Sequence, residues 1–164
     1  MSGSAIISPC GRYRLRLDRV TGDVGPVVAI IGVNPSTADA TKNDHTIRKD
    51  IGFATRLGWS RIIKANLCGY RATDVRELAA CDDPVGPDTD LHLLQIMTEA
   101  DIIVAAWGAS AKLPAWLRHR YLDVVDMAEA VGKPLFCFGT AKDGQPRHTL
   151  TLAYSTPLVL WCAP

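Results

Sequence analysis

The chain has 164 residues and a formal net charge of +1, with 48% hydrophobic and 21% charged residues. This composition is typical of a globular protein and excludes a disordered chain, and the length suffices for one domain with a sizeable core. No apolar run approaches the roughly 18–20 residues that a membrane span needs, and the first residues lack the pattern of a secretory signal. We therefore expect a cytoplasmic protein with no membrane partner.

The five cysteines do not have the spacing of a metal site. Their number is odd and no two of them form a C-x-x-C pair, which zinc ribbons and iron–sulfur clusters require. We expect reduced thiols, no metal and no cofactor. The small net charge neither favours nor excludes a nucleic-acid partner.

The first periodic segment is residues 12–20, in which arginines alternate with apolar residues. A period of two predicts a half-buried strand, and we expect its basic face, made by Arg12, Arg14 and Arg16, to be a plain polar surface. We place residues 1–26 in an N-terminal strand or hairpin that extends the main domain.

Strands and helices alternate through the rest of the chain. Short apolar runs rich in Val and Ile indicate buried parallel strands. These runs are residues 26–34, 60–67, 101–108 and 133–139. Helical spacing of apolar residues predicts helices at residues 45–59, 87–100 and 111–132. A loop, a short helix or turn and a last apolar segment fill residues 140–161.

Two of the predicted helices carry further signals. Asp44 can cap the first helix through its side chain, and Gly58 can end it. In the second helix we expect Leu91, Leu94 and Met97 to face the core.

The alternation predicts one α/β domain over residues 1–164. We expect a three-layer αβα sandwich with a four-stranded, mostly parallel central sheet. Ligands of open α/β sheets bind outside the carboxyl ends of the strands. The chain lacks the P-loop, the dinucleotide-binding glycine motif and the Gly-x-Ser-x-Gly nucleophile elbow.

Polar groups nevertheless follow the predicted strands in a fixed order. Gly32-Val-Asn34-Pro35 ends the first strand, and Asn66 ends the second. A Trp-Gly pair, Trp107 and Gly108, ends the third strand, and His148 lies in a late loop.

This order resembles the uracil-DNA glycosylase superfamily, and especially its mismatch-specific members that act on thymine and uracil. "GVNPS" resembles their Gly-Ile-Asn-Pro-Gly motif, and "DHTIRKDIGFATRLGW" resembles the polar loop and helix behind it. "IIKANL" resembles the strand that ends in a base-reading asparagine. "VAAWGASA" resembles the Leu-Leu-Trp-Gly segment, and "PRHTLTL" resembles a degraded His-Pro-Ser-Pro motif.

The whole chain also resembles a bacterial and phage domain family of unknown function. Its members share Leu-Asn-Pro-Ser near the start, Arg-Ala-Thr in the middle and Lys-Asp-Gly-x-Pro-x-His-Pro late. Here these stretches read "VNPS", "RAT" and "KDGQPRHT". We interpret that family as a divergent branch of the glycosylase fold.

The resemblance implies specific roles. Asn34 would orient a water through its amide oxygen, and Pro35 would stiffen the turn. Asn66 would read the edge of the base, because an amide offers both a donor and an acceptor. His148 would donate to the leaving base or to a phosphate.

Other residues complete the predicted site. Base contacts are assigned to Gly32, Ser36, Trp107 and Gly108, with Asp39, Asp44 and His45 in a second ring. Contacts to DNA phosphates are assigned to Lys64, Arg71, Lys142 and Arg147.

Each assignment has a plain structural alternative. Asn34 and Pro35 are also turn formers, and Asn66 can cap a loop or helix. Trp107 is a common core residue, and His148 with Arg147 can form a solvated loop pair.

The implied function is a monofunctional, metal-free DNA base glycosylase, expected to be a monomer with DNA as its partner. It would hydrolyse the bond to a damaged, mismatched or modified base. His148 is followed by Thr-Leu-Thr rather than Pro-Ser-Pro, so the sequence does not match the DNA-intercalating part of that motif. Asn34 in place of Asp predicts weak activity on ordinary uracil. The alternatives are a non-catalytic nucleic-acid or nucleotide-binding module, and a hydrolase of free nucleosides or nucleotides.

Overall fold

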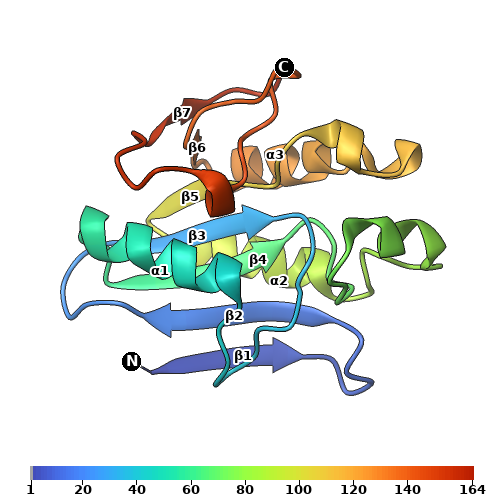
Figure 1. Ribbon diagram of the computed structural model, residues 1–164, viewed down its shortest axis with the longest axis horizontal. Coiled ribbons are helices and arrows are strands. Elements are labelled where there is room, and N and C mark those ends of the chain that lie inside the picture. Colours follow the sequence, from blue (N-terminus) through green and yellow to red (C-terminus); the bar gives the residue numbers. More distant parts are fainter. Residues whose placement is uncertain (1) are drawn as a thin grey trace.

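The computed structural model describes residues 2–164. It contains a single sheet with helices on both faces (Figure 1). The strands are β1 (Gly3–Ile7), β2 (Arg14–Val20), β3 (Val27–Gly32), β4 (Arg61–Asn66), β5 (Ile102–Ala105), β6 (Leu135–Cys137) and β7 (Val159–Trp161). The α-helices are α1 (His45–Leu57), α2 (Thr89–Glu99) and α3 (Tyr121–Ala130). Short 3₁₀ turns are η1 (Val75–Ala80), η2 (Ser110–Lys112), η3 (Ala115–Leu117) and η4 (Thr149–Thr151).

The sheet has the strand order β1-β2-β4-β3-β5-β6-β7. The inner strands β4, β3, β5 and β6 run parallel, whereas β1, β2 and β7 pair antiparallel at the two edges. The α/β class is confirmed, but the sheet is seven-stranded and mixed rather than four-stranded. The N-terminal hairpin pairs with β4 and the C-terminal segment pairs with β6, so both extend the sheet that the sequence predicts.

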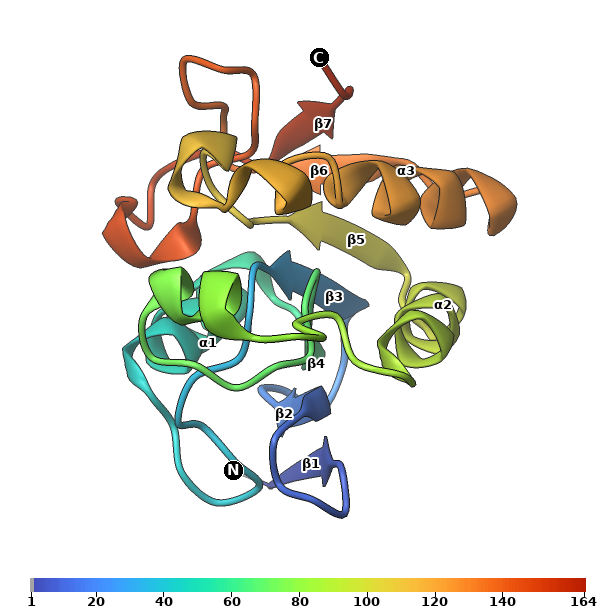
Figure 2. The same ribbon diagram turned by 90° about the vertical axis from the view of Figure 1, so that its right-hand side faces the viewer.

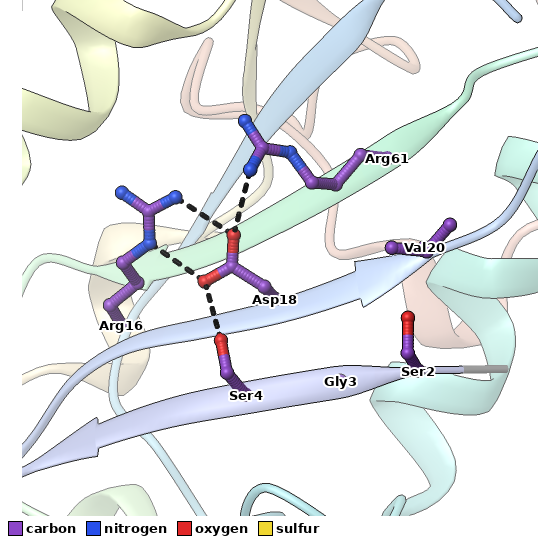
Figure 3. Close-up of a pocket in the computed structure, with 7 residues that line it drawn as sticks. All are labelled: Ser2, Gly3, Ser4, Arg16, Asp18, Val20 and Arg61. Carbon is purple, nitrogen blue, oxygen red and sulfur yellow. Dashed lines mark hydrogen bonds and ion pairs between the residues drawn. The ribbon is translucent and has the colours of Figure 1, made fainter. Parts of the chain in front are cut away.

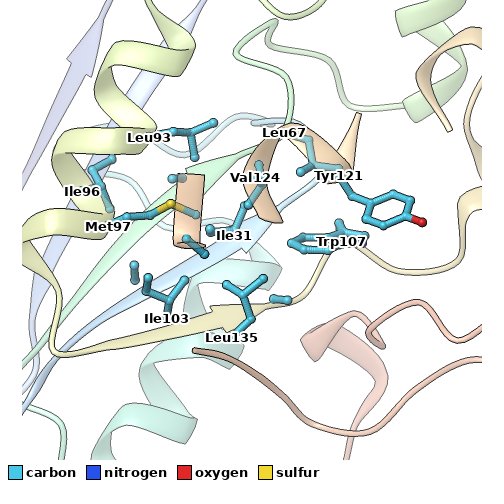
Figure 4. Packing of buried hydrophobic residues seen from close by; sticks show 14 of the residues in the cluster. Ile31, Leu67, Leu93, Ile96, Met97, Ile103, Trp107, Tyr121, Val124 and Leu135 are labelled. Carbon is cyan, nitrogen blue, oxygen red and sulfur yellow. The ribbon is translucent and has the colours of Figure 1, made fainter. Parts of the chain in front are cut away.

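Alternate residues of β3 enter two separate cores. Ala29 and Ile31 pack with α2 and α3, while Val28 and Ile30 pack with α1. Figures 1 and 2 show α1 on one face of the sheet and α2 with α3 on the other. Figure 4 shows the α2 and α3 side, where Met97 lies among the side chains of the sheet. Burial on both faces explains why the β3 sequence is continuously apolar.

Helix α1 begins and ends where its sequence predicts. The Asp44 side chain accepts a hydrogen bond from the Ile47 N–H at 2.9 Å. Gly58 ends the helix in the left-handed conformation, with φ of 69°. Asp44 thereby fixes the first turn of α1 at the carboxyl end of the sheet.

The inward face of α2 differs from the prediction. Leu91 and Leu94 are 56% and 40% exposed, whereas Leu93 and Ile96 are buried beside Met97. The helix is apolar on more than one side, so helical spacing alone allows two orientations. Packing against the sheet selects the face with Leu93.

Only part of the segment predicted as a long third helix is α-helical. The two short turns η2 and η3 precede α3, and Pro114 lies between them. Proline lacks the N–H that a continuous helix needs at that position. None of the helices in residues 2–164 is long and apolar enough to cross a membrane.

We expect Phe53→Ala to lower the free energy of unfolding by about 3–5 kcal/mol, because it leaves a cavity in the core beneath α1. Phe53 is 0% exposed and its ring lies 4.3 Å from that of Phe138. Leu57→Ala, in the same helix but at a position that is 44% exposed, should change stability by no more than about 0.5 kcal/mol. Urea unfolding followed by circular dichroism measures both; equal losses would contradict the packing described here.

Candidate functional site

The carboxyl ends of the inner strands open into a cavity of about 730 Å³. Gly32 and Asn66 end β3 and β4 opposite one another in the parallel register. The N-terminus of α1, the segment after β5 and the loop around His148 complete the walls. The volume falls within the roughly 300–1,000 Å³ of small-molecule sites.

Most of the predicted site residues line this cavity. They are Gly32, Asn34, Ser36, Asp44, His45, Lys64, Asn66, Trp107, Gly108 and His148. Pro35, Asp39, Arg71, Lys142 and Arg147 are not among its lining residues. Asn34, Asn66 and His148 come from three separate segments of the chain and meet around one space.

The Asn34 side chain has a defined orientation. Its Nδ2 donates to the carbonyl of Ala72 at 2.7 Å and to that of Pro35 at 3.2 Å. Because carbonyl oxygens only accept hydrogen bonds, they identify the nitrogen side of the amide. The Oδ1 atom is left as an acceptor for a water or a ligand.

The Asn66 side chain offers a ligand a donor, whereas Asn34 offers an acceptor. It is 5% exposed, and its Oδ1 accepts a 3.4 Å hydrogen bond from Arg14 Nη2. Its Nδ2 donates to no acceptor within residues 2–164, so it can serve a ligand. A Cβ at Gly32 would lie 2.9 Å from this nitrogen, closer than side chains pack. Glycine at position 32 therefore gives Asn66 the space to reach the cavity.

His148 presents a neutral imidazole. Its Nδ1 accepts a hydrogen bond from the Leu150 N–H at 3.2 Å, so Nε2 carries the proton of the neutral ring. Burial, together with the positive charge of Lys64, lowers the pKa of His148 to about 4. At neutral pH the ring is therefore a donor through Nε2 and not a cation. Gly108 packs against it, since a Cβ there would lie 3.7 Å from the Cβ of His148.

Lys64, predicted to contact a DNA phosphate, is buried in the structure, and that contact stays a prediction. It is 3% exposed and forms an ion pair with Asp50 at 2.9 Å. Asp50 is 0% exposed and also accepts from the Thr149 hydroxyl at 2.6 Å. Successive side chains of a strand point to opposite faces of the sheet. Ile63 and Ala65 therefore enter the core beside α2, and Lys64 points to the face that α1 covers. This chain of contacts connects β4, α1 and the residue after His148.

Trp107 anchors the loop before His148. It is 4% exposed, and its indole N–H donates to Gln145 Oε1 at 2.8 Å. Its ring also packs edge-to-face against Trp161. The Gly108 N–H donates to the carbonyl of Pro146 at 2.8 Å. Trp107 is thus mainly a packing residue, although it borders the cavity.

Two of the remaining predicted residues shape the loop after β3. Pro35 is buried, and its carbonyl accepts from the Ala72 N–H at 2.9 Å. Asp39 accepts from the N–H groups of Thr41 and Lys42, which close a turn and lower the pKa of the Asp39 carboxyl. The sequence predicts a ligand contact for Asp39, but these backbone hydrogen bonds direct its carboxylate to the turn.

The other predicted phosphate contacts lie outside the cavity. Lys142 and Arg147 are exposed on the loop between β6 and η4, where DNA can reach them. Arg71 is half-buried and donates to the Gly11 carbonyl at 3.2 Å. Their binding of phosphate stays a prediction.

Arg14 is a cavity residue that the sequence pattern did not identify. The pattern predicts a polar strand surface shared with Arg12 and Arg16, but Arg14 is 4% exposed and lines the cavity. Strand β2 runs antiparallel to β4, so its first residues lie beside the end of β4, where Asn66 is. Nothing in the spacing of three alternating arginines shows which one is covered.

A second, shallower depression lies over β1 and β2, away from the carboxyl ends of the parallel strands (Figure 3). There Asp18 pairs with Arg16 at 2.7 Å and with Arg61 at 3.7 Å, and both arginines also pair with Glu99. The two positive and two negative charges balance one another. We interpret this cluster as support for the sheet edge.

The chemistry of the cavity does not resemble a metal centre. In residues 2–164, no group of three or more His, Cys, Asp or Glu side chains is placed to hold a metal ion. The five cysteines are free thiols, of which Cys10 and Cys162 are exposed. The polar groups that line the cavity are amides, hydroxyls, carboxylates, cations and imidazoles.

The lowered pKa of His148 predicts a specific pH dependence of stability. Between its folded value of about 4 and its ordinary value of 6.5, the unfolded chain binds more protons than the native chain. This contribution to stability is therefore present above pH 6.5 and is lost as the pH falls toward 4, by up to about 3 kcal/mol. His148→Asn keeps a capping acceptor and should lack this loss. Urea unfolding at pH 7 and pH 4.5 measures it, and identical pH dependence in the two proteins would contradict it.

The comparisons with known proteins place the chain in a family without assigning an activity. No curated protein and no solved structure matches it. A family described as "Protein of unknown function (DUF1643)" matches residues 12–150, which include every cavity residue described above. The chain belongs to the DUF1643 family.

Proposed function

We propose that the protein hydrolyses the N-glycosidic bond of a base extruded from DNA. The observation that carries this proposal is the meeting of Asn34, Asn66 and His148 around one cavity at the carboxyl edge of the sheet. They supply an acceptor, a donor and a neutral donor, respectively. The motifs that resemble the uracil-DNA glycosylase superfamily, quoted above, support the same reaction.

Asn34 would position the attacking water. Its Oδ1 is free while its Nδ2 is held by the Ala72 carbonyl, so the amide cannot turn without losing that hydrogen bond. The water oxygen would bond to the sugar carbon as the bond to the base breaks, and the proton that the water loses would pass through solvent to the anionic base. An amide oxygen is a weak base, so a positioned water and not proton removal is its contribution.

His148 would stabilise the departing base. The base leaves with negative charge, and a hydrogen bond from Nε2–H is strongest in that state. Because burial lowers the pKa of His148 to about 4, the ring donates a hydrogen bond without transferring its proton. Asn66 would hold an acceptor on the base edge through Nδ2.

The depth of the site requires base flipping. Asn66 lies 5% exposed at the end of a central strand, which a base inside a duplex cannot reach. The base is expected to be damaged, mismatched or modified, since Asn34 replaces the stronger base Asp.

A second candidate is a hydrolase of free nucleosides or nucleotides, or a binding module for them. The observation that favours it is the burial of Lys64, one of the four residues assigned to DNA phosphates, inside the cavity instead of on an open surface. The cations Arg14 and Lys64 lie inside the cavity, where a small ligand would meet them.

Asn34→Ala should abolish base release, because it removes the water-positioning oxygen. DNAs from many sources, including modified phage DNAs, are incubated with the protein, and mass spectrometry identifies released bases. Asn43→Ala, which removes an amide outside the cavity, should retain the activity. Equal release by the Asn34→Ala protein would refute the role of this residue. Binding without release by the unaltered protein would favour the binding module.

DNA binding should weaken with salt if Lys142 and Arg147 bind phosphates. In Lys142→Gln and Arg147→Gln, the slope of log K against log salt should become less negative by roughly 0.9 for each phosphate that the variant leaves without a cation. Fluorescence anisotropy with a labelled oligonucleotide measures the slope. A slope near zero, with release of base from monomers, would support the free-nucleotide enzyme instead.

A further inference from the structure

We infer that the cavity binds an anionic oxygen group of its ligand, a carboxylate or a phosphate, through Arg14, Asn66 and Lys64. This inference rests on the proposed function for the identity of the site and specifies the class of substrate. A base that carries an acidic substituent and a nucleotide phosphate share this chemistry.

The first observation is a buried arginine without a carboxylate partner. Arg14 is 4% exposed and donates to two neutral acceptors, the Ala38 carbonyl at 3.0 Å and Asn66 Oδ1 at 3.4 Å. In residues 2–164 no carboxylate forms an ion pair with it, and the negative charges that favour its charged form, Asp44 and Asp50, act only through space. A buried guanidinium is costly unless an anion compensates it.

The second observation is a group of cavity donors that no protein acceptor occupies. Lys64 has three N–H donors, and one of them donates to Asp50. Asn66 Nδ2 has no protein acceptor within residues 2–164. The Nε2–H of His148 is a further donor without a protein acceptor within residues 2–164. A ligand that matches this set presents acceptors at the end that enters the cavity.

The third observation is that the donors converge. A Cβ at Gly32 would lie 2.9 Å from Asn66 Nδ2 and 3.4 Å from Lys64 Cε. Asn66 also contacts Arg14 directly. The three side chains therefore border the same volume, next to the positive N-terminal end of α1 at His45.

The negative charges around the cavity are already engaged. Asp50 pairs with Lys64, and Asp44 caps α1 through the Ile47 N–H. Asp74 borders the cavity and pairs with Arg76. No such pairing satisfies Arg14 within residues 2–164, so its buried charge is left for a ligand. Lys112 also lines the cavity without an ion pair there, but it is exposed to solvent.

Calorimetric titration of the full chain tests the inference with four probes. These are thymidine, thymidine 5′-monophosphate, 5-carboxy-2′-deoxyuridine and inorganic phosphate. We expect at least one anionic nucleoside probe to bind at least about tenfold more tightly than thymidine. Preference for the monophosphate, with competition by inorganic phosphate, identifies a nucleotide phosphate. Preference for the carboxylated base identifies an acidic substituent. Equal binding of thymidine and both anionic probes, or no binding of either anionic probe, overturns the inference.

Variants assign the preference to Arg14. Arg14→Met should reduce the affinity for the anionic probe to that of thymidine, while Arg12→Met, at an exposed neighbour, should leave it unchanged. Circular dichroism checks that each variant is folded. If Arg14→Met unfolds, Arg14→Lys keeps the charge but loses the forked donor, and its anion preference should fall by about threefold. An unchanged preference in the folded Arg14 variants overturns the role of this residue.

The outcome is separable from that of the proposed reaction. Asn34→Ala should abolish base release without altering the anion preference, because Asn34 contributes an acceptor. If no DNA or nucleotide releases its base but the anion preference depends on Arg14, the reaction fails and the binding inference stands. If base release is found but charged and neutral probes bind with equal affinity, the proposed reaction stands and the binding inference fails.

Discussion

A buried ion pair between Lys64 and Asp50 determines how the parts of the cavity are held together. Lys64 belongs to a central strand, Asp50 to the helix on one face of the sheet, and Thr149 to η4, directly after His148. Removal of one charge of a buried ion pair destabilises the fold, because the other charge is left buried and uncompensated. The pair therefore keeps α1 and the loop with His148 at fixed positions over the strand ends. It also places a positive charge beside the imidazole, which contributes to the low pKa of His148.

Around this pair, hydrogen bonds hold the side chains of the cavity in fixed orientations. Backbone carbonyls fix the amide of Asn34, the Leu150 N–H fixes the ring of His148, and Arg14 fixes Asn66. Groups held in this way lose little entropy when a ligand binds. This preorganisation suits the proposed hydrolysis, in which positioning and electrostatic stabilisation supply most of the rate.

Much of this arrangement follows from the sequence, because strand ends and caps have local signals. The apolar runs predict β3 to β6, Asp44 and Gly58 predict the bounds of α1, and the polar residues after the strands predict the cavity wall. The location of Arg14 and the burial of Lys64 depend on which strands pair, and pairing joins segments far apart in the chain. The inward face of α2 likewise depends on packing, since its apolar residues fit two orientations.

The pairing of Asn34 with Pro35 has a consequence for the chemical durability of the cavity. Asparagine side chains commonly deamidate through attack by the backbone nitrogen of the next residue. That nitrogen needs a proton to lose, and the nitrogen of Pro35 has none. The side-chain amide of Asn34, whose Nδ2 donates to the Ala72 carbonyl, should therefore not convert to a carboxylate by this route as the protein ages.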